Sequence, residues 1–461
     1  MSLFIIIAAL ALLMLVAYRG YSVILFAPVC ALLAVLLTEP ALVLPMFGGV
    51  FMEKVAGFLK LYFPVFILGA VFGKVIELAG FSKSIVSAVG RVVDRKRSVL
   101  SIVLVCAVLT YGGVSLFVVV FAVYPFAAEM FRQGDIPKRL IPGTLALGSF
   151  TFTMDALPGS PQIQNIIPTT FFKTDTWAAP WLGIIGSVFI LAAGLAYLSW
   201  RRNAAALAGE GYGAGHINEP EPFAAERLPN PWLALTPLLL VAGLNKLFTA
   251  AIPSSLGKTV TIDLPGNPLT VDVTKMAGLW AVEGALLAGI LFVVACAYRR
   301  VATKFAEGSK VAISGALLAC MNTASEYGFG GVIAALPGFA AVANALKSIP
   351  NPLVNEAITV TTLAGITGSA SGGLSIALAS MSETFIQAAN AAQIPLEVMH
   401  RVASMASGGM DTLPHNGAVI TLLAVTGLTH RTSYRDIFAV TLIKTAAVFV
   451  VILVYYLTGI V

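Results

Sequence analysis

Long apolar runs separated by short polar connections dominate the chain. The runs cover residues 2–17, 21–37, 61–79, 98–131, 179–200, 231–252, 276–298, 311–346, 358–381 and 437–460. A helix that crosses the hydrocarbon core of a bilayer needs about 20 predominantly apolar residues. Several runs are shorter than this and others are much longer. We therefore expect an all-α polytopic membrane protein with roughly ten to twelve spanning helices, several of them broken or re-entrant.

The N-terminal run, residues 2–17, is interpreted as the first spanning helix. No basic segment precedes it, and the residues after it, Tyr18-Arg19-Gly20, do not form a small-residue cleavage site. The sequence therefore favours a retained helix over a cleaved signal peptide.

The composition supports a membrane class and argues against nucleic-acid binding. Of 461 residues, 58% are hydrophobic and only 11% are charged, whereas soluble domains carry about 25% charged residues. The net charge of +6 comes from Lys and Arg residues that lie between apolar runs. That distribution is typical of the positive-inside rule, so the expected surroundings are a lipid bilayer.

A polar segment at residues 201–230 divides the chain into two parts. It is rich in Ala and Gly and contains Pro220 and Pro222. We expect a solvated cytoplasmic linker without a core of its own, between an N-terminal transmembrane half (1–200) and a C-terminal one (231–461).

Basic clusters predict which ends face the cytoplasm. They are Arg91, Arg95, Lys96 and Arg97; Arg201 and Arg202; and Arg299, Arg300, Lys304 and Lys310. By contrast, residues 259–274 contain no cation and form two alternating arms around a Pro-Gly-Asn-Pro turn. This pattern predicts an extracytoplasmic β-hairpin.

The cysteines give no sign of a metal site. Each lies in an apolar run, and none has the spacing of a zinc or redox motif. We expect small buried hydrophobic side chains, and no metal or other cofactor. The four are Cys30, Cys106, Cys296 and Cys320.

One short motif occurs twice. Residues 154–158 read Met-Asp-Ala-Leu-Pro and residues 410–414 read Met-Asp-Thr-Leu-Pro, each after a small, polar approach and before a turn. Farther upstream, the Tyr-Gly-Gly of residues 111–113 weakly matches the Tyr-Gly-Phe-Gly of residues 327–330. Related halves with interrupted helices in matching positions are typical of secondary transporters. The alternative is a Pro kink in each of two ordinary helices.

Interrupted helices can bind an anion, because the break leaves backbone N–H groups free at the start of the second half-helix. After the first motif, Pro158 and Gly159 end one helix, and Ser160 is expected to cap the next. His415 and Asn416 can do the same after the second motif.

Hydroxyls complete the predicted substrate site. Thr367, Ser369 and Ser371 lie in a Gly-rich stretch and can hold a substrate hydroxyl. Small residues packing two helices tightly are the alternative interpretation of that stretch. Tyr111 and Gly112, from the upstream segment, are added to the predicted substrate-binding set.

Asp155, Glu326 and Asp411 are the predicted proton-coupling residues. Each lies inside an apolar segment, where a charged group is costly and therefore indicates a functional role. A carboxylate beside the anion site repels the substrate unless it is protonated, which couples the two. The alternatives are helix capping for the Asp residues and an ion pair for Glu326. Lys246 and Lys444 lie near run ends and are expected to snorkel, which leaves no lone cation as the substrate's counter-charge.

The chain resembles the gluconate:proton symporter (GntP) family of the ion transporter superfamily over nearly its whole length. Residues 110–115, 154–161 and 405–419 carry the resemblance, the last most specifically. It implies proton-coupled uptake of sugar acids or short hydroxy acids across a bacterial inner membrane. It also implies two inverted halves, each with a re-entrant hairpin and a broken helix, and a homodimer. Residues 405–419 look closer to the branch of D-β-hydroxybutyrate permeases than to the gluconate carriers.

Two other classes of function were weighed against a carrier. An intramembrane aspartyl protease is disfavoured because the chain has no Tyr-Asp pair, and it also lacks HExxH and Gly-x-Ser-x-Gly motifs. An anion channel on the same scaffold remains open, as does Na⁺ in place of H⁺ as the coupling ion.

Overall fold

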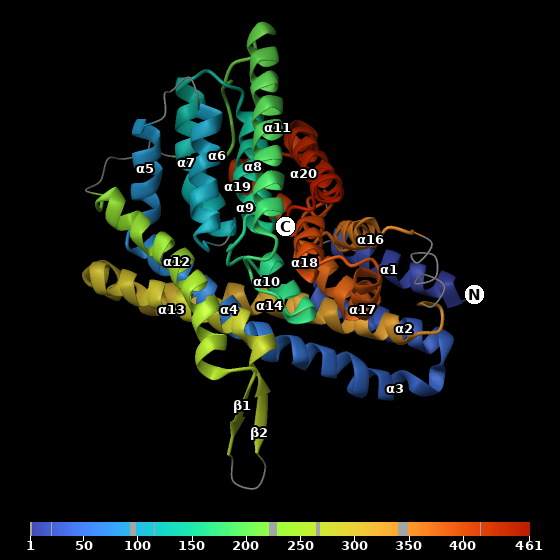
Figure 1. The fold of residues 1–461 in the computed structure, drawn as a ribbon. Coiled ribbons are helices and arrows are strands. Elements are labelled where there is room, and N and C mark those ends of the chain that lie inside the picture. Colours follow the sequence, from blue (N-terminus) through green and yellow to red (C-terminus); the bar gives the residue numbers. More distant parts are fainter. Residues whose placement is uncertain are drawn as a thin grey trace.

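The computed structural model describes residues 2–19, 21–92, 98–114, 116–220, 228–263, 268–339, 349–414 and 416–461. These residues form a body of helices from which one β-hairpin projects (Figure 1). His415, one of the predicted site residues, lies outside the described residues.

The regular secondary structure described in the N-terminal half is helical. Its first helices run on into a 3₁₀ turn, Pro40–Leu42, and a π-helical turn, Met46–Phe51, before the long α4. The helices are α1 Ser2–Tyr18, α2 Val23–Thr38, α3 Val43–Pro45, α4 Met52–Leu78, α5 Phe81–Val92, α6 Ser98–Tyr111, α7 Leu116–Gln133, α8 Ile141–Ser149, α9 Phe152–Asp155, α10 Ile163–Phe172 and α11 Pro180–Leu207.

The C-terminal half adds a small sheet between two long helices. Its elements are α12 Pro231–Leu256, β1 Thr259–Ile262, β2 Leu269–Asp272, α13 Val273–Ala302, α14 Phe305–Ala335, α16 Pro352–Thr367, α17 Ala370–Ala391, α18 Leu396–Ser407, α19 Gly417–Thr426 and α20 His430–Thr458. The strands pair antiparallel, with Thr259 opposite Asp272, which confirms the predicted hairpin.

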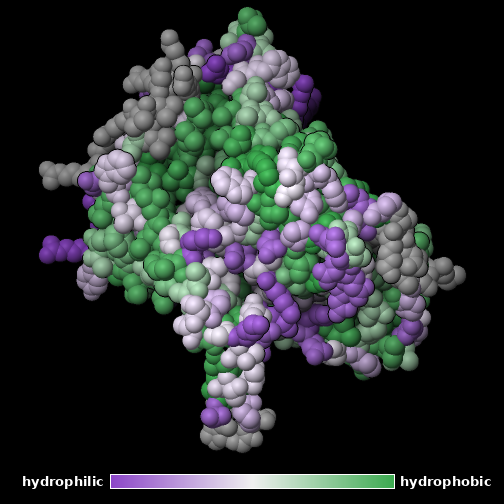
Figure 2. All heavy atoms as spheres, viewed as in Figure 1, coloured by the Kyte–Doolittle hydropathy of each residue, from purple (hydrophilic) through white to green (hydrophobic). Residues whose placement is uncertain are grey.

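The helices have the length and surface of membrane spans. Among the described residues, five helical stretches of 26 to 39 residues are apolar enough to cross a bilayer, and shorter apolar helices accompany them. Large apolar side chains such as Leu239 and Leu291 are exposed, and apolar residues cover broad areas of the surface (Figure 2). Such a surface suits lipid and not water. The predicted class, an all-α polytopic membrane protein, is confirmed.

Two of the longest apolar runs fold as helical hairpins. Residues 98–131 divide into α6 and α7, which pack together, and residues 358–381 lie in α16 and α17, which also pack together. Gly113 (φ +91°) and Gly368 (φ +64°) form the turns in a left-handed conformation that Gly adopts without strain. The expectation that long runs are interrupted is confirmed at both places.

The weak upstream match of the sequence repeat is wrong. Tyr111 is the last residue of α6, at a hairpin tip, whereas Tyr327 lies inside the uninterrupted α14. Gly328 in α14 packs against Phe51 and Val55, so it serves close helix packing and not a turn. The two segments therefore have similar sequences but occupy different structural positions.

The connection between the halves is exposed over most of its described length, but a few of its side chains pack on the N-terminal helices. Residues 201–207 continue α11, and the backbone N–H of the buried Tyr212 donates a hydrogen bond to Asp135 Oδ1 at 2.9 Å. Glu219 accepts hydrogen bonds or ion pairs from Arg132 and the fully buried Lys138. Burial favours a raised pKa for Glu219, but these cations and the Tyr212 hydroxyl outweigh it and lower the pKa. The predicted linker is therefore solvated over most of its described residues, but Tyr212 is buried and Glu219 is paired with cations of the N-terminal half.

Three of the four cysteines are buried as expected. Cys296 is exposed, because it lies on the outer side of α13 near its end. The prediction of a buried side chain is wrong for this residue.

Candidate functional site

Both copies of the repeated motif interrupt a helical path. The first lies at the end of the single-turn α9 and continues as an extended segment to α10, and the second connects α18 to α19. Asn416 caps α19, since its side chain accepts a hydrogen bond from Val419 N at 2.9 Å. This cap confirms the expectation for the second copy.

Ser160 does not cap a helix, contrary to the prediction. Helix α10 begins three residues later, after Gln162, which makes no side-chain cap. The Ser160 hydroxyl instead donates to Thr153 O at 2.7 Å, so it ties the extended segment back to α9. The strong local preference of Ser for caps is overridden by a carbonyl that the broken helix leaves free.

Asp155 is buried at the junction of the two motif copies. Its side chain is 1% exposed, and neither carboxylate oxygen has a hydrogen-bond partner among the described residues. Oδ2 lies against Gly408, the residue after α18, so closely that a Cβ on Gly408 would overlap it. Lys444, Asp411 and Arg401 all interact with this carboxylate electrostatically. Asp155 therefore does not cap its own half-helix, which was the alternative interpretation.

Asp411, the matching residue of the second copy, forms a buried ion pair with Lys444. Their side chains are 5% and 1% exposed. The Lys444 ammonium also donates to Phe150 O at 3.1 Å, between α8 and α9. Lys444 thus joins the two helix breaks, and the expectation that it snorkels to the membrane surface is wrong. The residue reaches this position because α20 packs against both α8 and α18.

Arg401 is a buried cation that holds the first break in place. Its guanidinium donates to Ala178 O at 2.8 and 3.1 Å, Asp155 O at 3.2 Å, Asn165 Oδ1 at 3.0 Å and Thr176 O at 3.4 Å. These contacts use the whole planar fork of donors. Arg401 therefore clamps the backbone around Asp155 and does not offer free donors to a substrate.

Asn165 and His400 extend this polar core. Asn165 Nδ2 donates to Ser160 O at 3.0 Å and Thr176 O at 2.9 Å, while His400 contacts Asn165 Oδ1 at 3.2 Å and Thr174 Oγ1 at 2.6 Å. Both side chains are fully buried. The network fixes the extended segment after the first motif, where no regular helix supplies partners for the backbone.

The first hairpin tip closes over this segment. The Tyr111 hydroxyl donates to Pro158 O at 2.9 Å. Gly112 packs so closely on Leu238 that a side chain there would clash, and the left-handed Gly159 packs on the Trp177 ring. The predicted residues of the first half are therefore in contact with one another, but both hydroxyls of the set, those of Tyr111 and Ser160, are engaged by protein carbonyls.

The second hairpin tip gathers hydroxyls at the start of α17. Ser369 caps α17 by accepting from Gly372 N at 3.0 Å. The Ser371 hydroxyl lies 3.2 Å from Thr323 Oγ1 and 3.5 Å from Ser369 Oγ. Thr367 donates back to Leu363 O at 3.0 Å, in its own helix. Ser371 is thus the predicted hydroxyl whose neighbours are other hydroxyls.

Glu326 approaches this tip from α14. Its side chain is 3% exposed, and Oε2 has no hydrogen-bond partner within the part of the chain that the structure describes. The carboxylate lies against Gly372, in the first turn of α17, where a Cβ would overlap it. A helix N-terminus favours a negative charge nearby. The alternative reading of Glu326, an ion pair with a distant Lys, has no support among the ion pairs of the described residues.

Gly372→Ala tests how tightly the Glu326 carboxylate is held. We expect a destabilised protein with impaired uptake, because the added methyl group displaces the carboxylate from the tip. Thermal unfolding in detergent measures the first effect. Gly315→Ala, at an exposed position of α14, is the matched control because no atom lies near its Cβ position. An equal response of the two variants would show that the carboxylate moves aside freely.

The two parts of the predicted site meet through the second motif. Asn416 Nδ2 donates to Gly368 O at 2.7 Å, and Gly365 packs against Met410. On its other side, Gly408 touches Asp155. The predicted residues that the structure describes therefore form one continuous set of contacts, from Tyr111 to Glu326.

Sequence reasoning missed several buried charged residues. Arg401 and Lys444 were not assigned to the site, and Glu356 of α16 is fully buried with both oxygens unpartnered among the described residues. A usable signal existed for Arg401, since it lies in the short helix leading directly into the second motif. Lys444 lies in the middle of the C-terminal apolar run, too far from both ends to snorkel easily.

The comparisons with known proteins identify relatives. No family model matches the chain. It is 60% identical over 472 aligned residues, with both chains covered completely, to the uncharacterized transporter YxjC of Bacillus subtilis (strain 168). Among solved structures, it is similar to the YdaH transporter of Alcanivorax borkumensis, with a TM-score of 0.49 and 17% identity, over 92% of this chain and 90% of that chain. By its identity to YxjC over the full length of both proteins, the chain belongs to the same family of membrane transporters.

Proposed function

We propose that this transporter is a secondary active carrier that brings a small hydroxy-carboxylate, such as 3-hydroxybutyrate, into a bacterial cell together with a proton. The proposal places it in the inner membrane and treats residues 1–200 and 231–461 as two inverted repeats, as the resemblance to the GntP family implies. The specific support comes from buried carboxylates at the helix breaks.

The observation that carries the proposal is the unpartnered carboxylate of Asp155. An ionised carboxylate buried without a hydrogen-bond donor is costly, whereas the neutral acid is buried far more cheaply. Asp155 has no donor among the described residues and lies between the two motif copies. A proton that binds Asp155 therefore removes the free-energy cost of burying its charge, which no hydrogen bond from the described residues offsets.

Counting charges explains how a proton and an anion can bind together. Asp155 and Asp411 supply two negative charges, and Lys444 and Arg401 supply two positive ones around the first break. An anionic substrate adds one negative charge, and a proton on Asp155 removes one. Each ligand thus favours the other by the same free energy, which is the thermodynamic requirement for symport.

The second hairpin tip suits the substrate itself. The capped N-termini of α17 and α19 favour a carboxylate, and Ser371 lies beside further hydroxyls that can hold a substrate hydroxyl. Glu326 next to this tip is a second proton-binding group in the proposal. Thr367 and Ser369 at this tip already bond to protein backbone, so few of its hydroxyls remain for a substrate, which supports a short hydroxy acid over a sugar acid with many hydroxyls.

Uptake into liposomes tests the proposal. Purified protein is reconstituted, and uptake of labelled D-3-hydroxybutyrate is measured under an inward proton gradient and then under a sodium gradient, with and without gluconate. We expect saturable, proton-driven uptake that gluconate barely inhibits. In Asp155→Asn, which cannot bind the proton, we expect proton-driven uptake to fall roughly 10- to 100-fold.

Other outcomes separate the parts of the proposal. Strong inhibition by gluconate would make a sugar acid the substrate, while uptake driven only by sodium would contradict the role of the carboxylates as proton sites. Flux that does not saturate would indicate an anion channel. Asp263→Asn, in the projecting hairpin outside the predicted site, is the control for loss of a carboxylate.

A further inference from the structure

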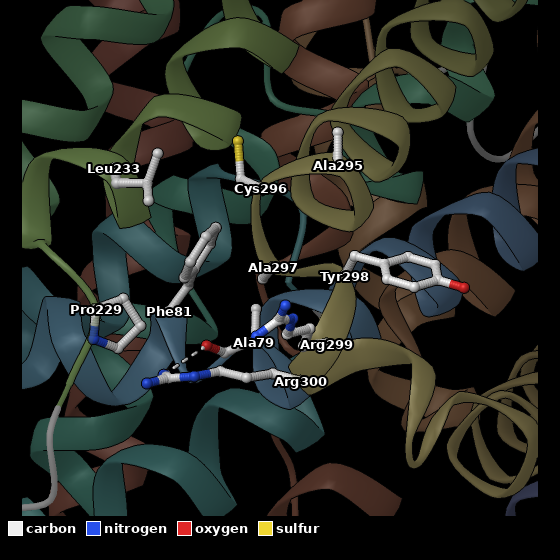
Figure 3. Close-up of a pocket in the computed structure, with 10 residues that line it drawn as sticks. All are labelled: Ala79, Phe81, Pro229, Leu233, Ala295, Cys296, Ala297, Tyr298, Arg299 and Arg300. Atoms are coloured by element: carbon white, nitrogen blue, oxygen red, sulfur yellow. Dashed lines mark hydrogen bonds between the residues drawn. The ribbon is translucent and has the colours of Figure 1, made fainter.

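A cavity of about 420 Å³ lies away from the motif copies, where α4, α5, α12 and the end of α13 meet. This volume is within the range of roughly 300–1,000 Å³ typical of ligand pockets. Figure 3 shows the Phe81 ring between Leu233 of α12 and α13, with the Arg300 side chain at one end of the group. Its lining residues are Ala79, Phe81, Pro229, Leu233, Ala295, Cys296, Ala297, Tyr298, Arg299 and Arg300.

The cavity is apolar inside and basic at one end. Among the residues that the structure describes, Arg299 and Arg300 are the charged lining residues, and no acidic residue lines the cavity. Both arginines are exposed overall, and each adds a positive charge at the cavity mouth. The Arg300 guanidinium donates to Ala79 O at 3.4 Å, which keeps it near the end of α4 (Figure 3).

The cavity adjoins the lipid-facing sides of two spans. Helices α12 and α13 are both long and apolar enough to cross a membrane, and Leu239 and Leu291 on them are exposed. At Ala297 the backbone leaves helical geometry (φ −124°, ψ 28°), so the last turn with both arginines starts from a kink beside the cavity. Spans end where lipid headgroups lie, and the arginines mark that end as cytoplasmic by the positive-inside rule.

We propose that this cavity binds an anionic phospholipid of the cytoplasmic leaflet. One acyl chain occupies the apolar space between α12 and α13, and Arg299 and Arg300 bind the headgroup phosphate, since arginine matches the geometry of a phosphate oxyanion. A zwitterionic lipid such as phosphatidylcholine carries a cationic amine beside its phosphate, and the two arginines repel that cation. The site is independent of the transported substrate.

Native mass spectrometry of the purified full-length protein tests this proposal, with phosphatidylglycerol and phosphatidylcholine titrated separately. We expect tight binding of phosphatidylglycerol and much weaker binding of phosphatidylcholine. Each basic residue near an anionic lipid contributes roughly fivefold in affinity. Arg299→Gln/Arg300→Gln should therefore weaken phosphatidylglycerol binding by about 25-fold. Ala295→Trp, which fills the cavity without changing charge, should weaken the binding of the acyl chain.

Control variants and a competitor separate the sources of binding. Arg431→Gln/Arg435→Gln removes the same charge from exposed positions outside the cavity and should leave binding unchanged. Equal affinity for the two lipids, or unchanged binding in the arginine variant, would overturn the proposal. Displacement of the lipid by inorganic phosphate alone, with no effect of Ala295→Trp, would overturn it in favour of a free-phosphate site.

Discussion

Replacing Lys444 with Met is expected to destabilise the folded protein by about 3–5 kcal/mol, because it leaves the buried Asp411 carboxylate without its partner. The Lys444 ammonium also satisfies Phe150 O, which loses its donor in the variant. Both side chains of the pair are almost fully buried, so solvent cannot replace the lost interactions. Thermal or denaturant unfolding in detergent measures the effect.

A double variant distinguishes the ion pair from simple packing. Asp411→Asn combined with Lys444→Met removes both charges, and we expect it to recover most of the lost stability, since a buried pair replaced as a whole is often nearly neutral. Lys246→Met is the matched control, because Lys246 is exposed and, among the described residues, lies 4.9 Å from the centre of the Trp177 ring without an ion pair. If the double variant is as unstable as Lys444→Met, then Lys444 stabilises the protein through packing or its bond to Phe150 O and not through the ion pair.

The same variants report on transport. Lys444 links the two motif copies, since it contacts Asp411 in one break and Phe150 in the other. Any movement of one copy relative to the other during transport must therefore change these contacts. The stable double variant should therefore fold but transport without proton coupling. Its uptake rate should no longer respond to an imposed proton gradient.

The interruptions of the helices could be predicted because their causes are local. Pro158 and Gly159 in one copy, and Asn416 in the other, act on the backbone within a few residues of themselves. The β-hairpin at residues 259–274 followed from alternation and turn residues in the same way. Length alone indicated that run 98–131 holds more than one helix.

The partners of the buried charges could not be predicted, because helix packing determines them. Asp411 and Lys444 are 33 positions apart, and Arg401 reaches Ala178 across 223 positions. Nothing in the local sequence specifies that α20 crosses α8 or that α18 packs on α10. The position of Lys444 inside an apolar run indicated a cost, but not which group offsets it.

The similar sequences at Tyr111 and Tyr327 do not share a structure. An aromatic residue followed by glycines serves a turn at Tyr111, but in α14 the glycines let Phe51, Val55 and Ile376 approach closely. Both uses place Gly where a Cβ does not fit, so composition cannot separate them. The structural counterpart of the first tip, in which two packed helices meet at a Gly turn, is the stretch around Gly368.

Replacing Arg401 is also expected to cause a large loss of stability. Arg401→Met removes both hydrogen bonds to Ala178 O, and it also removes one of the donors to Asp155 O and to Thr176 O, which keep Ser404 and Asn165 as donors. We expect a loss of about 3–5 kcal/mol in the free energy of unfolding, comparable to breaking a buried ion pair. Arg431→Met, at an exposed position, is the control and should change stability by less than about 0.5 kcal/mol.

Arg401→Lys separates a clamp from a substrate ligand. Lysine keeps the positive charge but cannot reproduce a planar fork that reaches several carbonyl groups at once. If Arg401 acts as a clamp, the variant is destabilised and the loss of uptake follows the loss of folded protein. If the guanidinium instead binds the substrate carboxylate, the variant stays stable and only its KM rises. The hydrogen bonds to Ala178, Asp155 and Asn165 favour the first result, because they leave the guanidinium little capacity for a further anion.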